Sequence, residues 1–381
     1  MFEREIIHHS YLPAGKGKED DMARLFSITL LFFLSGVLSA QAQPTAYIGS
    51  NNNNTVSIVD VPTNRVVRVF SLNNGSSADT SDVSSDSMFI YYGGNTVTAI
   101  DTSTTGIVGQ VVVGNAGSNG IAVSPDGTVL YVTSSITDTL TVIRTSDFTV
   151  TDTIPLGPGP DNLAFTPDGA KAYVTDQVDN LLYVIDAATL TVSLTIPIPG
   201  GSLVRNICVA PNGQFAYVSS TGSNIVSVID TTTDTVIDTV TVGDSPRNIA
   251  FTPDGAFAYV PNGSSDDVSV IRTSDHTVVD TIPTDQDTPH GVDVTPDGQF
   301  VYVTAIFSDD VAVIRTSDNT VIDTISGGQL DGLVDNGRFI VNAPPPVRSI
   351  PTLGEWGMIA MACILGLAAY KAMTRRRAKT A

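Results

Sequence analysis

A turn of sequence Pro-Asp-Gly or Pro-Asn-Gly recurs along most of this chain, and its spacing constrains the fold more than any other feature. The turns begin every 42 to 44 residues, at Pro125, Pro167, Pro211, Pro253 and Pro296. Each repeat holds four short segments of alternating apolar and polar residues, as in 289–294, 300–304, 311–315 and 320–325, and such alternation is typical of β-strands. A four-stranded repeat of this length indicates a β-propeller, because one blade buries both faces only when its neighbours stack on it.

The number of repeats follows from a tyrosine that opens the second strand of each unit. It occurs seven times, at Tyr47, Tyr91, Tyr131, Tyr173, Tyr217, Tyr259 and Tyr302. The sequence therefore predicts an all-β, seven-bladed propeller of four-stranded antiparallel blades over residues 43–342. The first unit lacks its innermost strand, whereas the end of the domain has a surplus segment at 329–334, followed by 336–341. We expect this late strand at 329–334 to complete the N-terminal blade and close the ring, which removes exposed sheet edges. Residues 339–341 match residues 47–49 in pattern. Either segment is therefore a candidate for the strand that pairs in the closing blade.

The repeat units resemble those of the YVTN propeller family. The family pattern of Tyr-Val-Thr-Asn followed by Thr-Val-Ser-Val-Ile-Asp is matched by residues 131–134, 173–176 and 226–230, and the likeness extends from Tyr47 to about Val341. The resemblance implies the propeller fold, while activities within such propellers vary. Some relatives resemble lactonase-like or quinoprotein-like enzymes, which require a metal cage or dense cofactor contacts.

Acidic residues outnumber basic ones, and the excess lies in the repeats. The whole chain has 39 acidic and 19 basic residues. Residues 1–42 and 343–381 together hold six acids and ten bases, which leaves the propeller with 33 acids, 9 bases and a formal charge of −24. All of these acids are Asp, a residue that favours tight turns, so many hairpins explain the composition. The negative charge argues against binding nucleic acid or an anionic membrane surface.

Few residues with metal-binding or catalytic chemistry are left for the propeller. Calcium binding is the alternative role for the carboxylates, but the closest clusters are Asp266-Asp267 and Asp309-Asp310, without an EF-hand loop. The repeats contain no Glu and only two His, His276 and His290. We expect His276 to be exposed on an outer strand. These numbers argue against a His-rich zinc or copper site and against most acid–base pairs. We therefore predict no catalytic residue, no metal and no cofactor.

The N-terminal residues have the pattern of a secretory signal over 22–42. Met22-Ala23-Arg24 forms a basic start, residues 25–38 are apolar, and Ala40-Gln41-Ala42 supplies a cleavage site for signal peptidase. The mature protein is expected to begin near Gln43. Residues 1–21 include Glu19-Asp20-Asp21, which does not suit a signal peptide. We interpret 1–21 as preceding a true start at Met22, with an unusually long leader as the alternative.

The C-terminal end contains a linker, a motif and a hydrophobic segment. The proline-rich residues 343–349 connect the propeller to residues 350–381. This tail resembles the IPTLxxWG sorting signal of exported bacterial proteins, whose specified positions are matched by Ile350, Pro351, Thr352, Leu353, Trp356 and Gly357. An apolar run over 358–373 and the arginines at 375–377 predict one transmembrane helix with the propeller outside the cytoplasm. The resemblance implies processing by an exosortase-type membrane protease in a Gram-negative bacterium, followed by surface display or release; a plain membrane anchor is the alternative.

One position of the repeat carries a polar or charged side chain in every unit. Counting eight residues back from the turn glycine, or from its equivalent, gives Asp79, Asn119, Asp161, Arg205, Arg247, His290 and Gln329. Because this position precedes the innermost strand, we expect these side chains to surround one mouth of the central channel, a frequent location for ligand sites. Arg205, Arg247 and His290 fall on three consecutive blades. We call these three residues the basic arc; it lies opposite Asp79 and Asp161.

The basic arc has two interpretations. Arginine offers paired N–H donors to carboxylate or phosphate, and the next residues in three units, Asn162, Asn206 and Asn248, offer further hydrogen bonds to a bound anion. Alternatively, the arginines pair with the aspartates across a water-filled channel. Charged clusters also arise for structural reasons, and the sequence alone favours this second interpretation.

Together, these features predict an exported, noncatalytic binding module, displayed at the envelope or the cell surface. Its partner is expected to be a protein, a glycan or a small anionic ligand, bound through the channel mouth or the loops. A lactonase-like or cofactor-dependent enzyme and a purely structural surface protein are the alternatives. A stoichiometric metal at the channel would favour the enzyme.

Overall fold

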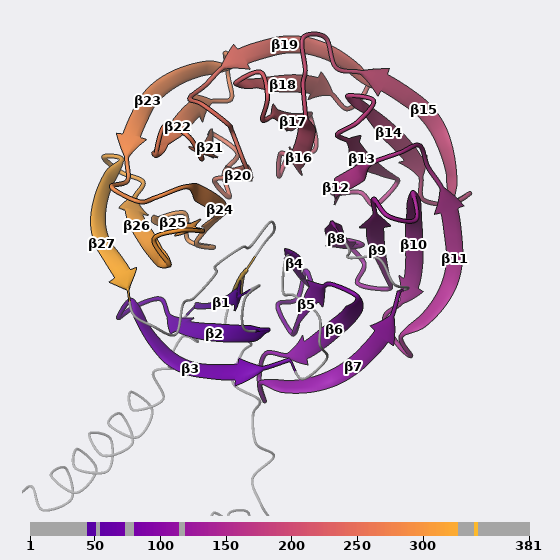
Figure 1. Cartoon of the computed structure of the whole chain (residues 1–381), viewed down its shortest axis with the longest axis horizontal. Coiled ribbons are helices and arrows are strands. Elements are labelled where there is room, and N and C mark those ends of the chain that lie inside the picture. The colour runs from indigo at the N-terminus through magenta and orange to yellow at the C-terminus, as the bar shows by residue number, and fades with distance from the viewer. Residues whose placement is uncertain (1–43, 51–53, 73–79, 114–118, 327–338, 342–381) are drawn as a thin grey trace, which may run out of the picture. The chain divides into compact units, whose positions relative to one another are not determined.

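The computed structural model describes residues 44–50, 54–72, 80–113, 119–326 and 339–341. These residues form seven four-stranded sheets, arranged around a central opening with one strand of each sheet innermost (Figure 1). Neighbouring strands within each sheet are antiparallel. The predicted all-β, seven-bladed propeller is therefore confirmed. Among the described residues, no helix is long and apolar enough to cross a membrane.

Six blades are each built from four strands that are consecutive in the sequence. Blade 2 contains β4 (Thr80–Val83), β5 (Phe89–Gly93), β6 (Thr96–Asp101) and β7 (Gly106–Val112); blade 3 contains β8 (Gly120–Val123), β9 (Val129–Ser134), β10 (Thr139–Arg144) and β11 (Thr149–Pro155). Blade 4 contains β12 (Pro160–Phe165), β13 (Lys171–Asp176), β14 (Leu181–Asp186) and β15 (Thr191–Pro197); blade 5 contains β16 (Val204–Val209), β17 (Phe215–Ser220), β18 (Ile225–Asp230) and β19 (Thr235–Thr241). Blade 6 contains β20 (Ala250–Phe251), β21 (Phe257–Asn262), β22 (Asp267–Arg272) and β23 (Thr277–Pro283); blade 7 contains β24 (Pro289–Val294), β25 (Phe300–Ala305), β26 (Asp310–Arg315) and β27 (Thr320–Ser326).

Blade 1 combines strands from both ends of the propeller. It contains β1 (Thr45–Ser50), β2 (Thr55–Asp60), β3 (Arg65–Ser71) and, in the innermost place, β28 (Ile340–Val341). β28 pairs antiparallel with β1, so that Ala46 lies opposite Ile340. The expected closure by N- and C-terminal strands is therefore confirmed. Of the two candidates, residues 340–341 fill the missing innermost place, and the strand of Tyr47 keeps the second place. The expectation that the segment 329–334 completes this blade is therefore wrong; that segment lies outside the described residues.

The recurring tyrosine joins each blade to the next. The Tyr47 hydroxyl donates to the carbonyl oxygen of Thr102 at 2.9 Å, and the Tyr302 hydroxyl donates to the carbonyl oxygen of Val61 at 3.1 Å. Both rings are at least 98% buried in the core between the blades. Tyrosine suits this place because its ring fills the apolar interface and its hydroxyl satisfies a partner at the edge.

The abundant aspartates close the turns. In the turn after β24, the Asp297 carboxylate accepts hydrogen bonds from the Thr295 hydroxyl at 2.6 Å and from the backbone N–H of Gln299 at 3.0 Å, and Gly298 takes a φ of 71°. Three equivalent carboxylates, Asp126, Asp168 and Asp254, are bonded in the same way, and hydrogen bonds from their Ser or Thr partners lower their pKa values. This geometry supports the interpretation of the acidic composition as turn formation.

Several predicted segments lie outside the described residues. They are the residues before the signal (1–21), the signal peptide (22–42), the linker (343–349) and the sorting signal with its transmembrane helix (350–381).

Candidate functional site

Five of the seven predicted mouth residues are described, and each stands at the start of an innermost strand or just before it. Asn119, Asp161, Arg205, Arg247 and His290 belong to blades 3 to 7 in that order. Their strands, β8, β12, β16, β20 and β24, face the central opening (Figure 1). The structure therefore places these five positions at one end of the channel. Asp79 and Gln329 lie outside the described residues.

The pairing of β28 with β1 affects which residue occupies the mouth position of blade 1, which the sequence assigns to Gln329. The backbone N–H of Tyr47 bonds to the carbonyl oxygen of Phe339 at 2.8 Å, so Phe339 takes the place that Asp293 takes opposite Tyr302 in blade 7. His290 stands three residues before Asp293, and the same count back from Phe339 gives position 336. Gln329 was counted from Gly337 on the expectation of an inner strand at 329–334, so its place in the ring stays a prediction.

Asp161 and Arg205 form the one ion pair found among the described mouth residues. Arg205 Nε lies 3.9 Å from Asp161 Oδ2, which is too long for a hydrogen bond. Burial raises the pKa of the Asp161 carboxyl to about 6, although the charge of Arg205 and a hydrogen bond from Asn119 act in the opposite direction. Pairing across the channel, the second interpretation of the arc, is thus limited in the described residues to this contact between adjacent blades.

Arg247 and His290 complete the basic arc without an ion pair among the described residues. Arg247 Nε packs over Gly263, where an added Cβ would come within 2.9 Å of it. Burial, and then the charge of Arg205, lower the pKa of the Arg247 guanidinium. His290 is 94% buried, and burial with the charges of Arg247 and Arg205 lowers the pKa of its imidazole to about 3. The arc therefore consists of two cations and one neutral imidazole near pH 7.

The basic arc also contains unpaired polar atoms. In the described part of the chain, nine buried side-chain polar atoms have no hydrogen-bond partner, and three of them are Arg205 Nε, Arg247 Nε and His290 Nδ1. The other six are oxygens, so every unpaired nitrogen in this set belongs to the arc. Leaving a buried polar group unpaired costs about 1–3 kcal/mol. Such a concentration in one place indicates a site that a ligand with acceptor oxygens would complete.

The asparagine layer lies one residue deeper along the channel. Asn162, Asn206 and Asn248 are buried, and the Asn162 side-chain N–H donates to Asn206 Oδ1 at 3.2 Å. A cavity of about 540 Å³ begins at Asn162 and Asn248 and reaches the opposite mouth, beside prolines of the Pro-Asp-Gly turns. The residues of the basic arc do not line this cavity. The arc and the cavity are thus two separate features of one channel, with the asparagines between them.

Two channel residues were missed in the sequence. Asp82 on β4 and Asp293 on β24 are 8% exposed and line the cavity. Each carboxylate accepts backbone hydrogen bonds from the next blade at 2.8 Å, Asp82 from Val123 and Asp293 from both Phe339 and Ile340. The signal was available, because the other described blades have Ala122, Ala164, Cys208, Ala250 or Phe339 at the same place. The two aspartates clamp neighbouring innermost strands together.

The expectation that His276 is exposed on an outer strand is wrong. His276 lies in the turn between β22 and β23 with a φ of 53°, and its Nδ1 is 2.7 Å from the hydroxyl oxygen of Tyr217. It is half-buried. This histidine takes the place of Asn319, whose Oδ1 accepts from Tyr259 at 2.9 Å in the next interface. Its role is to partner the recurring tyrosine.

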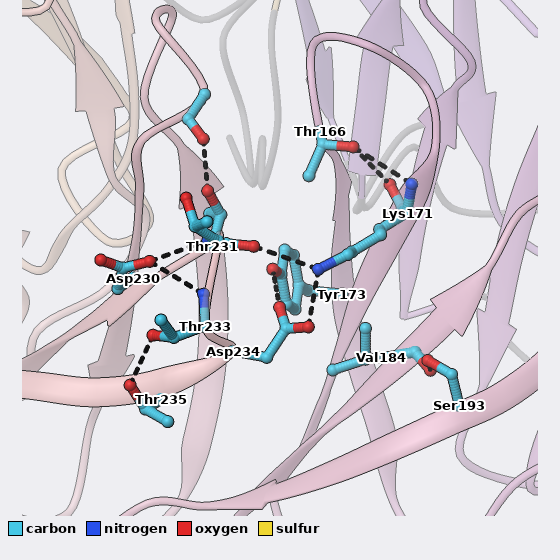
Figure 2. Close-up of polar contacts among 12 residues, drawn as sticks. Thr166, Lys171, Tyr173, Val184, Ser193, Asp230, Thr231, Thr233, Asp234 and Thr235 are labelled. Carbon is cyan, nitrogen blue, oxygen red and sulfur yellow. Dashed lines mark hydrogen bonds and ion pairs between the residues drawn. The ribbon is translucent and has the colours of Figure 1, made fainter.

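A Lys-Asp-Tyr cluster between blades 4 and 5 also arises from a turn residue that bonds the recurring tyrosine of the preceding blade. Lys171 Nζ lies 2.6 Å from Asp234 Oδ2 and 3.1 Å from the carbonyl oxygen of Thr231, and the Tyr173 hydroxyl donates to Asp234 Oδ1 at 2.5 Å (Figure 2). Burial and the hydrogen bond to Asp234 raise the pKa of Tyr173, so the phenol keeps its proton. Asp234 stands at the turn position that His276 occupies for Tyr217, and both of its carboxylate oxygens are bonded, to Lys171 and to Tyr173. The cluster therefore holds the blades together.

The described residues contain no group of three or more His, Cys, Asp or Glu side chains placed to hold a metal ion.

Acid stability provides a test of the burial of His290. Its pKa is about 3 in the folded protein and 6.5 for the ordinary group, so the unfolded chain binds more protons between these values and stability falls as pH decreases from 6.5 to 3. Asp161 acts with the opposite sign, because its raised pKa makes stability fall as pH increases from about 4 to 6. We expect His290→Gln to reduce the stability lost on acidification, measured as urea midpoints from pH 7 to pH 3. An unchanged slope in the variant would contradict a buried, neutral His290.

Comparisons with known proteins agree with this architecture. The model of the family described as lactonase, 7-bladed beta-propeller, matches residues 149–280, and the IPTL-CTERM motif model matches residues 348–377. The fold is similar to that of Kuenenia stuttgartiensis hydrazine synthase, with a TM-score of 0.58, 23% identity, and coverage of 63% of this chain and 77% of that chain. It is also similar to a functionally unknown protein from Desulfotomaculum acetoxidans, with a TM-score of 0.68, 16% identity, and coverage of 76% of this chain and 97% of that chain.

These likenesses differ in what they show. At such identities the two solved structures show the fold alone, and no curated protein matches the sequence. The lactonase model covers blades 4 and 5 and parts of blades 3 and 6, which include Asp161, Arg205 and Arg247 but not His290. The chain is thus a seven-bladed β-propeller, similar in its middle blades to the lactonase propellers, and it carries an IPTL-CTERM motif at its C-terminal end.

Proposed function

We propose that the protein is an exported, noncatalytic binding module whose ligand site is the basic arc, with an anionic group of the ligand held by Arg205 and Arg247. The observation that carries the proposal is the set of three buried nitrogens without a hydrogen-bond partner in the described residues, all of them in the arc. Arginine presents a planar array of N–H groups that fits the oxygens of carboxylate or phosphate. His290 Nδ1 offers a neutral contact beside them.

Export is supported by the C-terminal end of the chain. The IPTL-CTERM motif marks an exported, surface-sorted protein. We include in the proposal that signal peptidase removes residues up to 42, and that a membrane helix holds the chain until an exosortase-type protease cleaves near Ile350–Gly357. Fractionation of the source cells, with mass spectrometry of both termini of the mature protein, tests this route. A mature chain that retains the arginines at 375–377 would contradict C-terminal processing.

A lactonase-like hydrolase is the second candidate. Two observations favour it, namely the match of the lactonase model and a carboxyl group, Asp161, whose pKa of about 6 suits a general base. Lactone ring opening also yields a carboxylate, which the basic arc would accommodate. Hydrolysis of simple lactones by the protein, lost in Asp161→Asn, would establish this activity in place of pure binding.

Replacing Arg247 tests the binding proposal with simple anions. We expect Arg247→Gln to weaken binding of acetate and of inorganic phosphate by about tenfold, because a hydrogen bond to a charged group contributes about 1.5–3 kcal/mol. Isothermal titration calorimetry on the full chain in detergent solution measures the change.

Arg144→Gln is the matched control for this measurement. Arg144 has an exposed side chain on an outer hairpin, where it pairs with Asp147 at 2.8 Å, so the variant loses the same charge away from the channel. Equal losses in Arg247→Gln and Arg144→Gln would point to a general charge effect and would remove the proposed site. Failure of the unaltered protein to bind either anion would remove it as well.

A further inference from the structure

The channel mouth has a negative side and a positive side. In the described blades, the negative side is Asp161 on blade 4, supported by the Asn119 amide on blade 3. The positive side begins on the adjacent blade with Arg205 and continues with Arg247. A site built only for anions would gain nothing from a carboxylate at its edge, because the carboxylate repels the ligand.

The carboxylate and the arginines are incompletely paired with each other. The closest approach is the 3.9 Å between Arg205 Nε and Asp161 Oδ2, and Arg247 has no ion pair among the described residues. The Asp161 side chain is 14% exposed and that of Arg205 is 39% exposed, so a ligand can reach both. Both signs of charge are therefore presented at the mouth, side by side and within one ligand's reach.

Resting on the proposed function, we infer that the ligand is a small zwitterion of the α-amino-acid class, with its carboxylate on Arg205 and Arg247 and its ammonium on Asp161. The short separation of the opposite charges in the site argues for a short separation in the ligand. An α-amino acid carries its two charges on groups attached to one carbon. A long ω-amino acid would place them too far apart to use both sides of the mouth without folding back, which costs conformational entropy.

Matched probes separate the contributions of the two charges. Leu203, two residues before Arg205, is 44% exposed and offers an apolar surface near the site. Probes with and without an apolar side chain are therefore compared. The zwitterions are glycine and L-leucine, the corresponding anions are acetate and 4-methylpentanoate, and the corresponding cations are methylamine and 3-methylbutylamine. We expect the zwitterions to bind the full chain in detergent solution at least tenfold more tightly than either partner lacking one charge, and 6-aminohexanoate to bind no better than acetate.

The decisive variant is Asp161→Asn, because the sign of its effect depends on the ligand class. We expect about tenfold weaker binding of glycine and L-leucine, since the ammonium loses its counter-charge, and equal or tighter binding of acetate, since a repulsion disappears. Lowering the pH from 7.5 to about 6 should act in the same direction on the unaltered protein, because Asp161 takes up a proton near pH 6 while His290, whose pKa is about 3, stays neutral. Asp147→Asn, on an outer hairpin, is the control for the loss of one negative charge.

The outcomes distinguish this inference from the proposed function. If acetate binds as tightly as glycine, or if Asp161→Asn strengthens binding of zwitterions and anions alike, the site takes simple anions; the proposed function stands and the zwitterion assignment fails. If none of the six matched probes binds the unaltered protein but inorganic phosphate does, the zwitterion assignment fails and the proposed function stands; if phosphate does not bind either, both fail. Matched thermal unfolding of Asp161→Asn and the unaltered protein shows that the variant is folded.

Discussion

Replacing Asp293 with alanine is expected to lower the free energy of unfolding by roughly 3–5 kcal/mol, since a hydrogen bond to a charged group contributes about 1.5–3 kcal/mol. The Asp293 carboxylate accepts the backbone N–H groups of Phe339 and Ile340, both at 2.8 Å and both buried. Alanine leaves these two donors unpaired at the place where the C-terminal strand β28 enters blade 1. The loss is expected to appear as a lower midpoint in urea unfolding followed by circular dichroism.

Asp82→Ala is the matched comparison for this effect. Asp82 occupies the same place in blade 2, and the hydrogen bond seen from the next blade in the described part of the chain comes from the N–H of Val123. Asp82 does not hold the closing strand, so we expect about half of the loss seen for Asp293. Asp318→Ala removes an exposed carboxylate paired with Arg315 and should change stability by less than about 1 kcal/mol. If Asp293→Ala costs no more than Asp318→Ala, the clamp does not stabilise the closed ring.

Reversing the charge of both arginines is expected to abolish ligand binding. In Arg205→Glu/Arg247→Glu, two cations of the basic arc become carboxylates, one of them next to Asp161, so the ligand anion loses its hydrogen bonds and meets repulsion. Two lost charged hydrogen bonds alone correspond to at least about a 100-fold loss of affinity, and the repulsion should extend the loss to about 1,000-fold or more. Equilibrium titration with acetate, phosphate and glycine measures the loss.

Two further variants separate the lost hydrogen bonds from the change in net charge. Arg205→Gln/Arg247→Gln removes the charged donors without adding negative charge and is expected to keep most of the effect. Arg144→Glu/Arg315→Glu introduces the same change in net charge on outer hairpins, where both arginines are half-exposed, and should leave binding nearly unchanged. Unaltered affinity in the double reversal at the mouth would show that the arc pairs charges within the protein and binds no anion.

Much of the candidate site was accessible from the repeat register. A fixed count from the turn glycine placed Asn119, Asp161, Arg205, Arg247 and His290 at equivalent positions, and the structure brings them to one end of the channel. A count of five residues back from the turn glycine or its equivalent, three residues further along the chain, would have found Asp82 and Asp293, which interrupt a series of small or apolar residues. The count could not be extended safely to blade 1, because the innermost strand there comes from a distant segment without the repeat pattern.

By itself, the sequence determined the features that depend on local pattern at a regular spacing: seven four-stranded units, aspartate-closed turns and the C-terminal motif. The alternation of apolar and polar side chains in strands and the residue types of tight turns each depend on a few neighbouring residues. They can therefore be recognised in the sequence without knowledge of the fold. Only the tertiary structure decided that β28 closes the ring, that His276 partners Tyr217, and that His290 is buried and neutral. These properties depend on burial and on contacts between residues tens to hundreds of positions apart, and the unpaired nitrogens of Arg205, Arg247 and His290 arise from the same packing.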